Sequence, residues 1–311
     1  MGSLDASPGR ALYVVGLSGG GDSVALAWAL SHEAGPLGVD IGAVIVDHGV
    51  QADSAEVARR AAAEAEDLGL QPVIMKSVTI EGTANFEDKA RVVRYRAFTE
   101  ALRETGAQGV VLAHTLDDQA ETVLMGLARG SGPSGLKGMA MQDGTVHRPF
   151  LGLDRATVRQ ALVDAGRSWW EDPHNADERY TRVRVRNSVL PVLERELGPG
   201  VNGALARTAE LFREDSEALD GEASRWFENN ALTDETGSWS LEVEKLVQAS
   251  GAVQTRVLRM LVLRVGGGVP TYAHTAQMRR LLEAWKGQSA IDVPGASVER
   301  KDGRIYARAT K

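Results

Sequence analysis

The chain has 311 residues, a net charge of −7 and no cysteine. The absence of cysteine excludes disulfides, thiolate metal sites, iron–sulfur clusters and cysteine nucleophiles. The length is typical of two domains. The sequence contains neither an apolar run long enough to span a membrane nor a basic-then-apolar signal pattern, so we expect a cytoplasmic protein with no membrane partner.

The first half of the sequence alternates two kinds of pattern. Short, β-branched apolar runs predict buried parallel strands at 11–17, 41–47, 72–78 and 109–113. The segments between and after them predict helices at about 22–33, 53–68, 85–105 and 118–128. This order predicts an α/β fold with a doubly wound, Rossmann-like parallel sheet, in which ligands bind at the carboxyl ends of the strands.

The alternation stops after about residue 150. We expect a helix at 154–165, a connector rich in Trp and Arg at 167–192, and mostly helices from 200 to 286. The last segment, 289–309, is predicted to be a small antiparallel hairpin that turns at Asp302-Gly303. The predicted domains are therefore a catalytic domain with its connector, 1–195, and a mostly helical domain, 196–311.

A glycine loop follows the first predicted strand and opens the first helix. It comprises Ser18, Gly19, Gly20, Gly21, Asp22 and Ser23. Glycines allow close backbone approach, and a helix N-terminus offers free N–H groups to a phosphate. The loop lacks the lysine of a Walker-type loop, and Asp22 would repel phosphate unless it acts through Mg²⁺. The alternative interpretation is a tight turn with a polar N-cap.

Acidic residues open the helix after the fourth strand. Asp118 and Glu121 are three residues apart on its first turn, where they could cap the helix or hold a cationic substrate or a metal. His114 ends the strand and could be a core-edge histidine or a pocket residue. Together with Asp117 and Asp118, it would suit Mg²⁺ better than zinc.

Basic segments are the remaining candidates. On the helix that begins near Asn85, Arg91 either lines a pocket or lies on a solvated ion-pair face. The loop from Arg129 to Gly138, which includes Lys137, could clamp polyphosphate or RNA, or be an ordinary surface loop. Two tryptophans, Trp169 and Trp170, could stack on bases or join the two domains. They precede an acid-free strip that could bind phosphates and contains Arg179, Arg182, Arg184 and Arg186.

Together these segments resemble the N-type ATP pyrophosphatases (the PP-loop superfamily) and, within them, the tRNA(Ile)-lysidine synthetase family. Ser18–Ser23 is similar to the motif S-G-G-x-D-S, and Ala113–Thr122 is similar to A-H-x-x-D-D-Q-x-E-T. Further similarity covers 47–49, 85–95, 129–139, 148–149 and 170–186. The sequence departs from the family pattern at Asp88 and Val183.

The resemblance implies a ligase that uses ATP and Mg²⁺. It would adenylate C2 of the wobble cytidine in a tRNA(Ile) with a CAU anticodon, release pyrophosphate, and let L-lysine displace AMP. The implied ATP contacts are the loop 18–23 and Asp47, with Asp22 as the metal ligand. Asp118 and Glu121 would bind lysine, and His114 and Arg91 would line the same pocket as catalytic residues. The implied tRNA contacts are Arg129, Lys137, Arg182, Arg184, Arg186 and the domain after 196.

Three other classes of function are alternatives at the level of sequence: another enzyme with the same ATP loop, a serine hydrolase and an RNA-binding protein. A sulfur-inserting tRNA enzyme would use the same ATP site but needs cysteines, and amide-forming synthetases lack the 170–186 segment. A serine hydrolase is suggested by Gly16-Leu17-Ser18-Gly19-Gly20, which matches G-x-S-x-G. An RNA-binding protein without catalytic activity is the third. The sequence leaves the choice between a monomer and a homodimer open.

Overall fold

The computed structural model describes residues 9–49, 54–80, 86–171 and 176–310. The chain divides into two compact units, Met1–Phe212 and Arg213–Lys311, which are described separately below. None of the described helices is long and apolar enough to cross a membrane. Asn85 and residues 172–175 of the Trp-containing motif lie outside the described residues.

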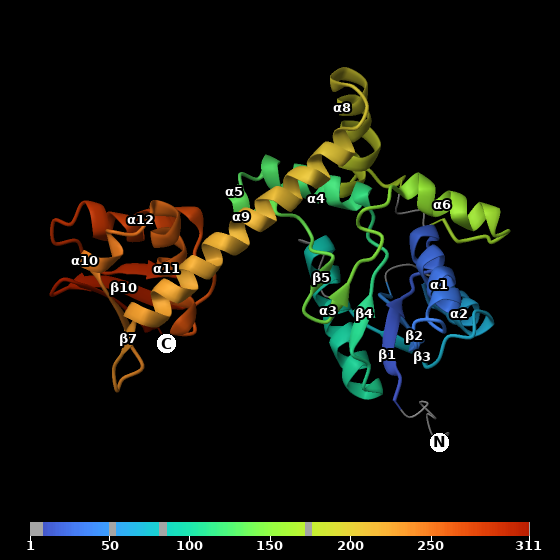
Figure 1. Cartoon of the computed structure of the whole chain (residues 1–311), viewed down its shortest axis with the longest axis horizontal. Coiled ribbons are helices and arrows are strands. Elements are labelled where there is room, and N and C mark those ends of the chain that lie inside the picture. The colour runs from blue at the N-terminus through green and yellow to red at the C-terminus, as the bar shows by residue number, and fades with distance from the viewer. Residues whose placement is uncertain (1–8, 50–53, 81–85, 172–175, 311) are drawn as a thin grey trace. The chain divides into compact units, whose positions relative to one another are not determined.

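The first unit contains a six-stranded sheet in the order β3-β2-β1-β4-β6-β5 (Figure 1). Five strands run parallel, and β5 pairs with β6 in the antiparallel direction at one edge. The predicted parallel sheet is therefore confirmed, whereas the two-residue strands β5 and β6 were not predicted. The bounds are β1 Ala11–Gly16, β2 Val39–Asp47, β3 Val73–Ser77, β4 Gly109–Val111, β5 Gln142–Asp143 and β6 Val146–His147.

Helices cover both faces of this sheet (Figure 1). Side chains alternate along a strand, so Val15 of β1 packs toward α1 (Gly21–Glu33), α2 (Ser54–Asp67) and α6 (Arg155–Asp164). Val14 packs on the opposite face, against α3 (Phe86–Thr105). Each face is apolar because both are covered, which explains the unbroken apolar runs of the strands.

The predicted connector is more helical than expected. It contains α7 (Thr181–Arg184), a π-helical turn η2 (Val185–Val189) and the start of α8 (Leu190–Leu197). Val185 and Leu190 pack with Ala120 of α4 (Leu116–Ala128) in a small separate cluster. A short helix α5 (Gly132–Leu136) follows α4. The packing fixes the arginine strip beside the acidic first turn of α4.

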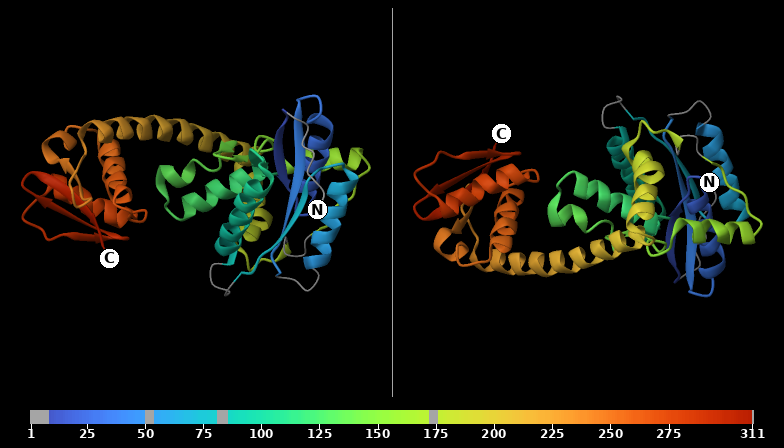
Figure 2. Two further views of the ribbon diagram at one scale, coloured as in Figure 1. Left: turned by 90° about the horizontal axis from the view of Figure 1, so that it is seen from below. Right: turned by 90° about the horizontal axis from the view of Figure 1, so that it is seen from above.

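The second unit is a five-stranded antiparallel sheet in the order β7-β8-β11-β10-β9. Its core includes Phe227, Leu258 and Met278, and α11 and α12 pack on one face of the sheet (Figure 2). The unit boundary falls within α9 (Val201–Asn230). The other bounds are β7 Leu232–Thr233, β8 Trp239–Glu242, α10 Val243–Leu246, α11 Gly251–Arg264, α12 Tyr272–Glu283, β9 Ile291–Val293, β10 Ala296–Lys301 and β11 Arg304–Ala309.

The terminal hairpin is confirmed, and the sheet is larger than predicted. Lys301 pairs with Arg304, and the two residues between them have positive φ, 48° at Asp302 and 73° at Gly303. A two-residue turn of this kind matches the twist of its strands. Strands β7 and β8 lie in a region predicted to be helical. That prediction was wrong because β8 is defined by its pairing with the distant β11.

Candidate functional site

The glycine loop joins β1 to the N-terminus of α1. Gly19 has a φ of +83°, which favours glycine, and the N-cap Gly20 provides no side-chain cap to the helix. Ser23 Oγ donates to the Gly20 carbonyl at 2.8 Å and lies 3.1 Å from Ser18 Oγ. The two serines therefore brace the loop at the N-terminus of α1, and helix N-termini are ready sites for anions.

The tryptophan pair covers this loop from the connector. The Trp170 N–H donates to the Gly19 carbonyl at 3.1 Å. The Trp169 ring lies so close to Gly21 that a Cβ there would be 3.2 Å from the indole. Trp169 Nε1 donates to Glu171 at 2.6 Å. Both tryptophans thus lie against the phosphate loop, within the first unit.

One cavity of about 510 Å³ connects most of the predicted site residues. Its lining includes the loop residues Ser18, Gly20, Gly21, Asp22 and Ser23, together with Asp47, Arg91, His114, Asp118 and Arg186. Asp47 ends β2, where its Oδ1 accepts a 2.9 Å hydrogen bond from Gly49 N. The carboxyl ends of the parallel strands thus bring together residues that lie up to a hundred positions apart in the sequence.

The acidic pair on α4 is the most enclosed part of the site. Asp118 Oδ2 accepts from the Thr115 N–H at 2.9 Å, so the carboxylate does cap its own helix. Its Oδ1 faces the other way, toward arginines. Burial alone would raise the pKa of Asp118, but Arg155, Arg182 and the Thr115 hydrogen bond lower it to about 2. Asp118 is therefore an anion at any physiological pH.

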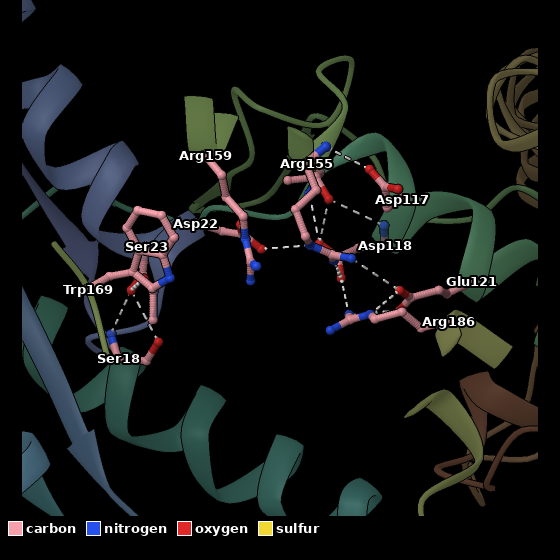
Figure 3. Close-up of polar contacts among 12 residues, drawn as sticks. Ser18, Asp22, Ser23, Asp117, Asp118, Glu121, Arg155, Arg159, Trp169 and Arg186 are labelled. Carbon is pink, nitrogen blue, oxygen red and sulfur yellow. Dashed lines mark hydrogen bonds and ion pairs between the residues drawn. The ribbon is translucent and has the colours of Figure 1, made fainter. Parts of the chain in front are cut away.

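Glu121 is fully buried, with 0% relative exposure. Its Oε2 accepts from Arg182 Nε at 2.6 Å, and its Oε1 accepts from Arg186 Nε at 2.6 Å. Arg186 also donates to Asp118 Oδ1 at 3.1 Å (Figure 3). Two members of the arginine strip, which were predicted to contact phosphates, thus neutralise the acidic pair in this structure.

Arg155 and Arg159, on α6, were missed by the sequence analysis. Arg155 Nε donates to Asp22 at 3.0 Å and its Nη2 donates to Asp118 at 2.9 Å (Figure 3). Arg159 lies 3.5 Å from Asp22 and 3.4 Å from Glu171. Their i, i+4 spacing on a helix that follows Arg148-Pro149 is a signal that could have indicated one basic face toward the site.

Two histidines line the cavity as neutral groups. Burial, with a contribution from Arg94, lowers the pKa of His48 to about 4. Burial also lowers the pKa of His114 to about 4, against the opposing charge of Asp118. The Nδ1 atoms of both are buried without a hydrogen-bond partner among the described residues. Both side chains thus line the cavity while one ring nitrogen of each is buried without a partner among these residues.

Other predicted residues lie outside the cavity lining. Arg129 and Arg184 are exposed, and Arg184 donates to the carbonyls of Glu178 and Arg179. Arg182 and Glu121 are not in the lining and pair with each other at 2.6 Å, and Lys137 is the C-cap residue of α5. Arg91, by contrast, belongs to the cavity lining, and its guanidinium lies over the Tyr95 ring at 4.8 Å.

The carboxylates do not form a ready metal site. Among the described residues there is no group of three or more His, Asp or Glu side chains that could hold a metal ion. Asp22 is the carboxylate within the glycine loop, and both of its oxygens contact arginines. Its Oδ2 contacts Arg155, and its Oδ1 contacts Arg159. A single carboxylate nevertheless fits Mg²⁺, which commonly takes one or two protein ligands and completes its shell with phosphates and water.

Comparisons with known proteins identify the families that the two parts of the chain match. Residues 4–193 match the family described as "PP-loop domain", and residues 241–306 match "TilS substrate binding domain". A tRNA(Ile)-lysidine synthase of Leifsonia xyli is 50% identical over 96% of this chain and 90% of the relative. Those of Thermobifida fusca and Streptomyces coelicolor are 45% and 46% identical, over 97% and 95% of this chain and 93% and 84% of the relatives.

A solved structure has a similar fold over about two thirds of this chain. The U34-tRNA thiolase NcsA from Methanococcus maripaludis, determined with its [4Fe-4S] cluster, superposes with a TM-score of 0.54 at 20% identity. The similarity covers 65% of this chain and 72% of the thiolase. At this identity the comparison supports the α/β fold alone.

Proposed function

The chain belongs to the tRNA(Ile)-lysidine synthase family, and from this premise we propose that it ligates L-lysine to C2 of the wobble cytidine of a tRNA(Ile) with a CAU anticodon. It is an ATP-dependent ligase. The observation that carries the detailed proposal is the shared cavity, which the glycine loop lines at one side and Asp118 at the other. The nucleotide and the amine would thus meet over the same space.

The phosphate loop suits release of pyrophosphate. Its backbone N–H groups would hold the β- and γ-phosphates while the C2 oxygen of cytidine attacks the α-phosphorus, forming an adenylated base. The loop has no lysine that would favour transfer of the outermost phosphate. Ser18 and Ser23 keep the loop in shape through their mutual contact, and Asp47 would bind the nucleoside end.

The acidic pair would select the lysine side chain. Asp118, ionised and held by Thr115, and Glu121 supply the negative charge that an ammonium group requires. We assign the attack on C2 to the ε-amine of lysine. This amine must be neutral to attack, so it first transfers a proton to water or to a carboxylate. His114 and Arg91 would line the same cavity, His114 as a neutral hydrogen-bond acceptor toward the base.

Magnesium would neutralise the phosphate charge when ATP is bound. Asp22 would be its protein ligand, with phosphate oxygens and water completing the shell. Because Arg155 and Arg159 contact both Asp22 oxygens, binding of the ion requires at least one of these contacts to be exchanged. Thermal unfolding with ATP should then show an added stabilisation from Mg²⁺ that Asp22→Asn removes.

The tRNA would contact two parts of the chain. Arg129, Lys137 and Arg184 are the proposed phosphate contacts in the first unit, and the domain after residue 196, which includes the match at 241–306, would bind the tRNA body. Arg182 and Arg186 are engaged by the acidic pair, so they would reach phosphate only by leaving it.

One incubation tests the proposal. The protein, ATP, Mg²⁺, lysine and a tRNA(Ile) transcript with a CAU anticodon should give one lysyl addition at the wobble base by mass spectrometry. Asp22→Ala should abolish the product, and Asp118→Ala should raise the lysine KM most strongly. Asp143→Ala, an exposed aspartate outside the cavity lining, is the matched control and should react normally. Normal activity of Asp22→Ala would contradict the assigned role.

Two alternatives find less support. A thiolase of the kind represented by the fold neighbour, which holds a [4Fe-4S] cluster, would need cluster ligands, and this sequence contains no cysteine. A serine hydrolase would need a base at Ser18, but among the described residues the hydroxyl of Ser18 contacts Ser23 rather than a histidine. Resistance of Ser18 to a fluorophosphonate would dismiss the second alternative.

A further inference from the structure

Arg155 connects the two halves of the proposed site. Its guanidinium donates to Asp22, in the phosphate loop, and to Asp118, in the acidic pair, and its Nη1 lies 3.7 Å from Glu121 (Figure 3). Its backbone N–H donates to Asp117 at 2.7 Å, which fixes the start of α6 beside α4. The side chain is 14% exposed, so these charges interact with little screening by water.

The charges of this cluster are balanced before any substrate binds. Four carboxylates face four guanidiniums, the acids being Asp22, Asp118, Glu121 and Glu171 and the bases Arg155, Arg159, Arg182 and Arg186. An ammonium group added between Asp118 and Glu121 would bring a further positive charge into a partly buried place. Burying an unpaired charge is costly, so one guanidinium must move away when lysine enters.

The contacts indicate which arginine moves. Arg182 and Arg186 each hold the fully buried Glu121 at 2.6 Å, and loss of either would leave that carboxylate poorly compensated. Arg155 makes its short contacts elsewhere, to Asp118 and Asp22, whose side chains keep 12% and 23% exposure. Arg155 is also the guanidinium that already reaches the phosphate loop, where ATP would offer it new anionic partners.

We infer that Arg155 occupies the ammonium subsite of the empty enzyme and moves to the nucleotide phosphates when ATP binds, so that ATP promotes lysine binding. The inference rests on the proposed function. Arg155 would act as a specificity-determining residue, because only a cation strong enough to replace its guanidinium could take the subsite. It would also delay lysine entry until the nucleotide is in place.

Lysine affinity of the unaltered protein gives the first test. Isothermal titration of L-lysine should be run without nucleotide and with Mg²⁺ and α,β-methylene-ATP, which cannot release pyrophosphate by the normal cleavage. We expect lysine to bind at least about 5-fold more tightly with the analogue, which is the lower end of common coupling between sites. Equal affinities, or no detectable binding in either state, would overturn the inference.

Replacement of Arg155 gives the second test. In Arg155→Gln the coupling should fall to about one, and lysine should bind without the analogue at least as tightly as it binds the unaltered protein without it. A merely structural role predicts the opposite pattern, a loss of affinity in both states with the ratio retained. Arg167→Gln removes an ion pair with Glu64 and Asp67 away from the cavity lining and should keep the full ratio.

Two measurements separate the possible failures. Thermal unfolding shows whether Arg155→Gln is folded. If this variant is unfolded, the lysine affinities of the unaltered protein with and without the analogue still test the inference. Lysidine formation is measured on the same preparations. If the unaltered protein forms lysidine but binds lysine equally well with and without the analogue, the role of Arg155 is wrong and the proposed function stands. If no lysidine forms under any condition, the proposed function itself is wrong.

Discussion

Single residues in this site have pKa values that their surroundings shift from the ordinary range. His48 and His114 both have a pKa lowered to about 4, with burial as the largest cause. An unfolded chain would restore a pKa near 6.5. Asp118, by contrast, has a pKa lowered to about 2, so its titration lies in a separate, more acidic range. These two histidines therefore make folding stability sensitive to mild acid.

Folding stability should fall between pH 6.5 and about 4. In this window the unfolded chain binds protons at His48 and His114 that the folded chain does not, so lower pH favours unfolding by up to about 1.4 kcal/mol per pH unit for each histidine. Above pH 6.5 both histidines are neutral in the folded and the unfolded chain, so this loss of folding stability is absent there. Urea unfolding at several pH values should show a shallower slope for the double variant His48→Gln, His114→Gln.

His32, an exposed histidine in the last turn of α1, serves as the control replacement for this pH dependence because it lies outside the cavity lining. Its replacement by Gln should leave the slope between pH 6.5 and 4 as steep as in the unaltered protein. Identical slopes for the double variant and the unaltered protein would contradict the assignment to His48 and His114.

At the scale of elements, α4 and the segment of α7 and η2 are joined by charge as well as by packing. Arg182 and Arg186 approach Glu121 from two consecutive turns, and Val185 between them packs against α4. π-Helical turns are frequent at functional sites. Here η2 carries Arg186 on the cavity lining, so the geometry of this turn determines how the acidic pair is covered.

Glu121→Gln should strongly destabilise the first unit. The change removes a fully buried carboxylate and leaves two guanidiniums without their nearest counter-charge, a kind of change that costs about 3–5 kcal/mol. Urea denaturation monitored by circular dichroism would measure the free energy of unfolding. Glu178→Gln, an exposed position in the same connector, should change it by less than about 0.5 kcal/mol. Similar values for both variants would refute the proposed importance of the buried pair.

At the scale of the whole molecule, an acidic protein is proposed to bind a polyanion. A net charge of −7 opposes association with tRNA at long range, so binding must depend on local basic residues. Two of the expected phosphate contacts, Arg182 and Arg186, form ion pairs with the acidic pair. The remaining proposed phosphate contacts of the first unit are Arg129, Lys137 and Arg184. Salt dependence is the direct measure of how many phosphates such residues meet.

Combined replacement of Arg129, Lys137 and Arg184 by Gln should weaken tRNA binding. Each lost phosphate contact should reduce the slope of log affinity against log salt concentration by about 0.7–0.9, which amounts to about 2–3 if all three residues contact phosphates. Filter binding at several salt concentrations would measure it. Arg59→Gln with Arg60→Gln, on the exposed side of α2, should leave the slope unchanged, and an unchanged slope in the triple variant would exclude these residues from the interface.

Much of the first unit could be predicted because its signals are local. The apolar runs gave the four main parallel strands, and the glycine loop stood out between a strand and a helix. Arg155 was missed because its i, i+4 spacing with Arg159 marks a basic helix face but does not show which groups that face contacts. Its importance depends on contacts with Asp22 and Asp118, which are 133 and 37 positions away. Strand β8 was missed for the same reason, since its partner β11 is remote in sequence.

The sequence alone determined the α/β sheet, the phosphate loop, the turn at Asp302-Gly303 and the set of acids and bases available to the site, because periodicity, glycine content and residue chemistry are encoded over short stretches. The tertiary structure decided which charges meet. Folding brought α6 and η2 against the acidic pair, and the mutual neutralisation of these buried groups can be read only once their positions in space are known.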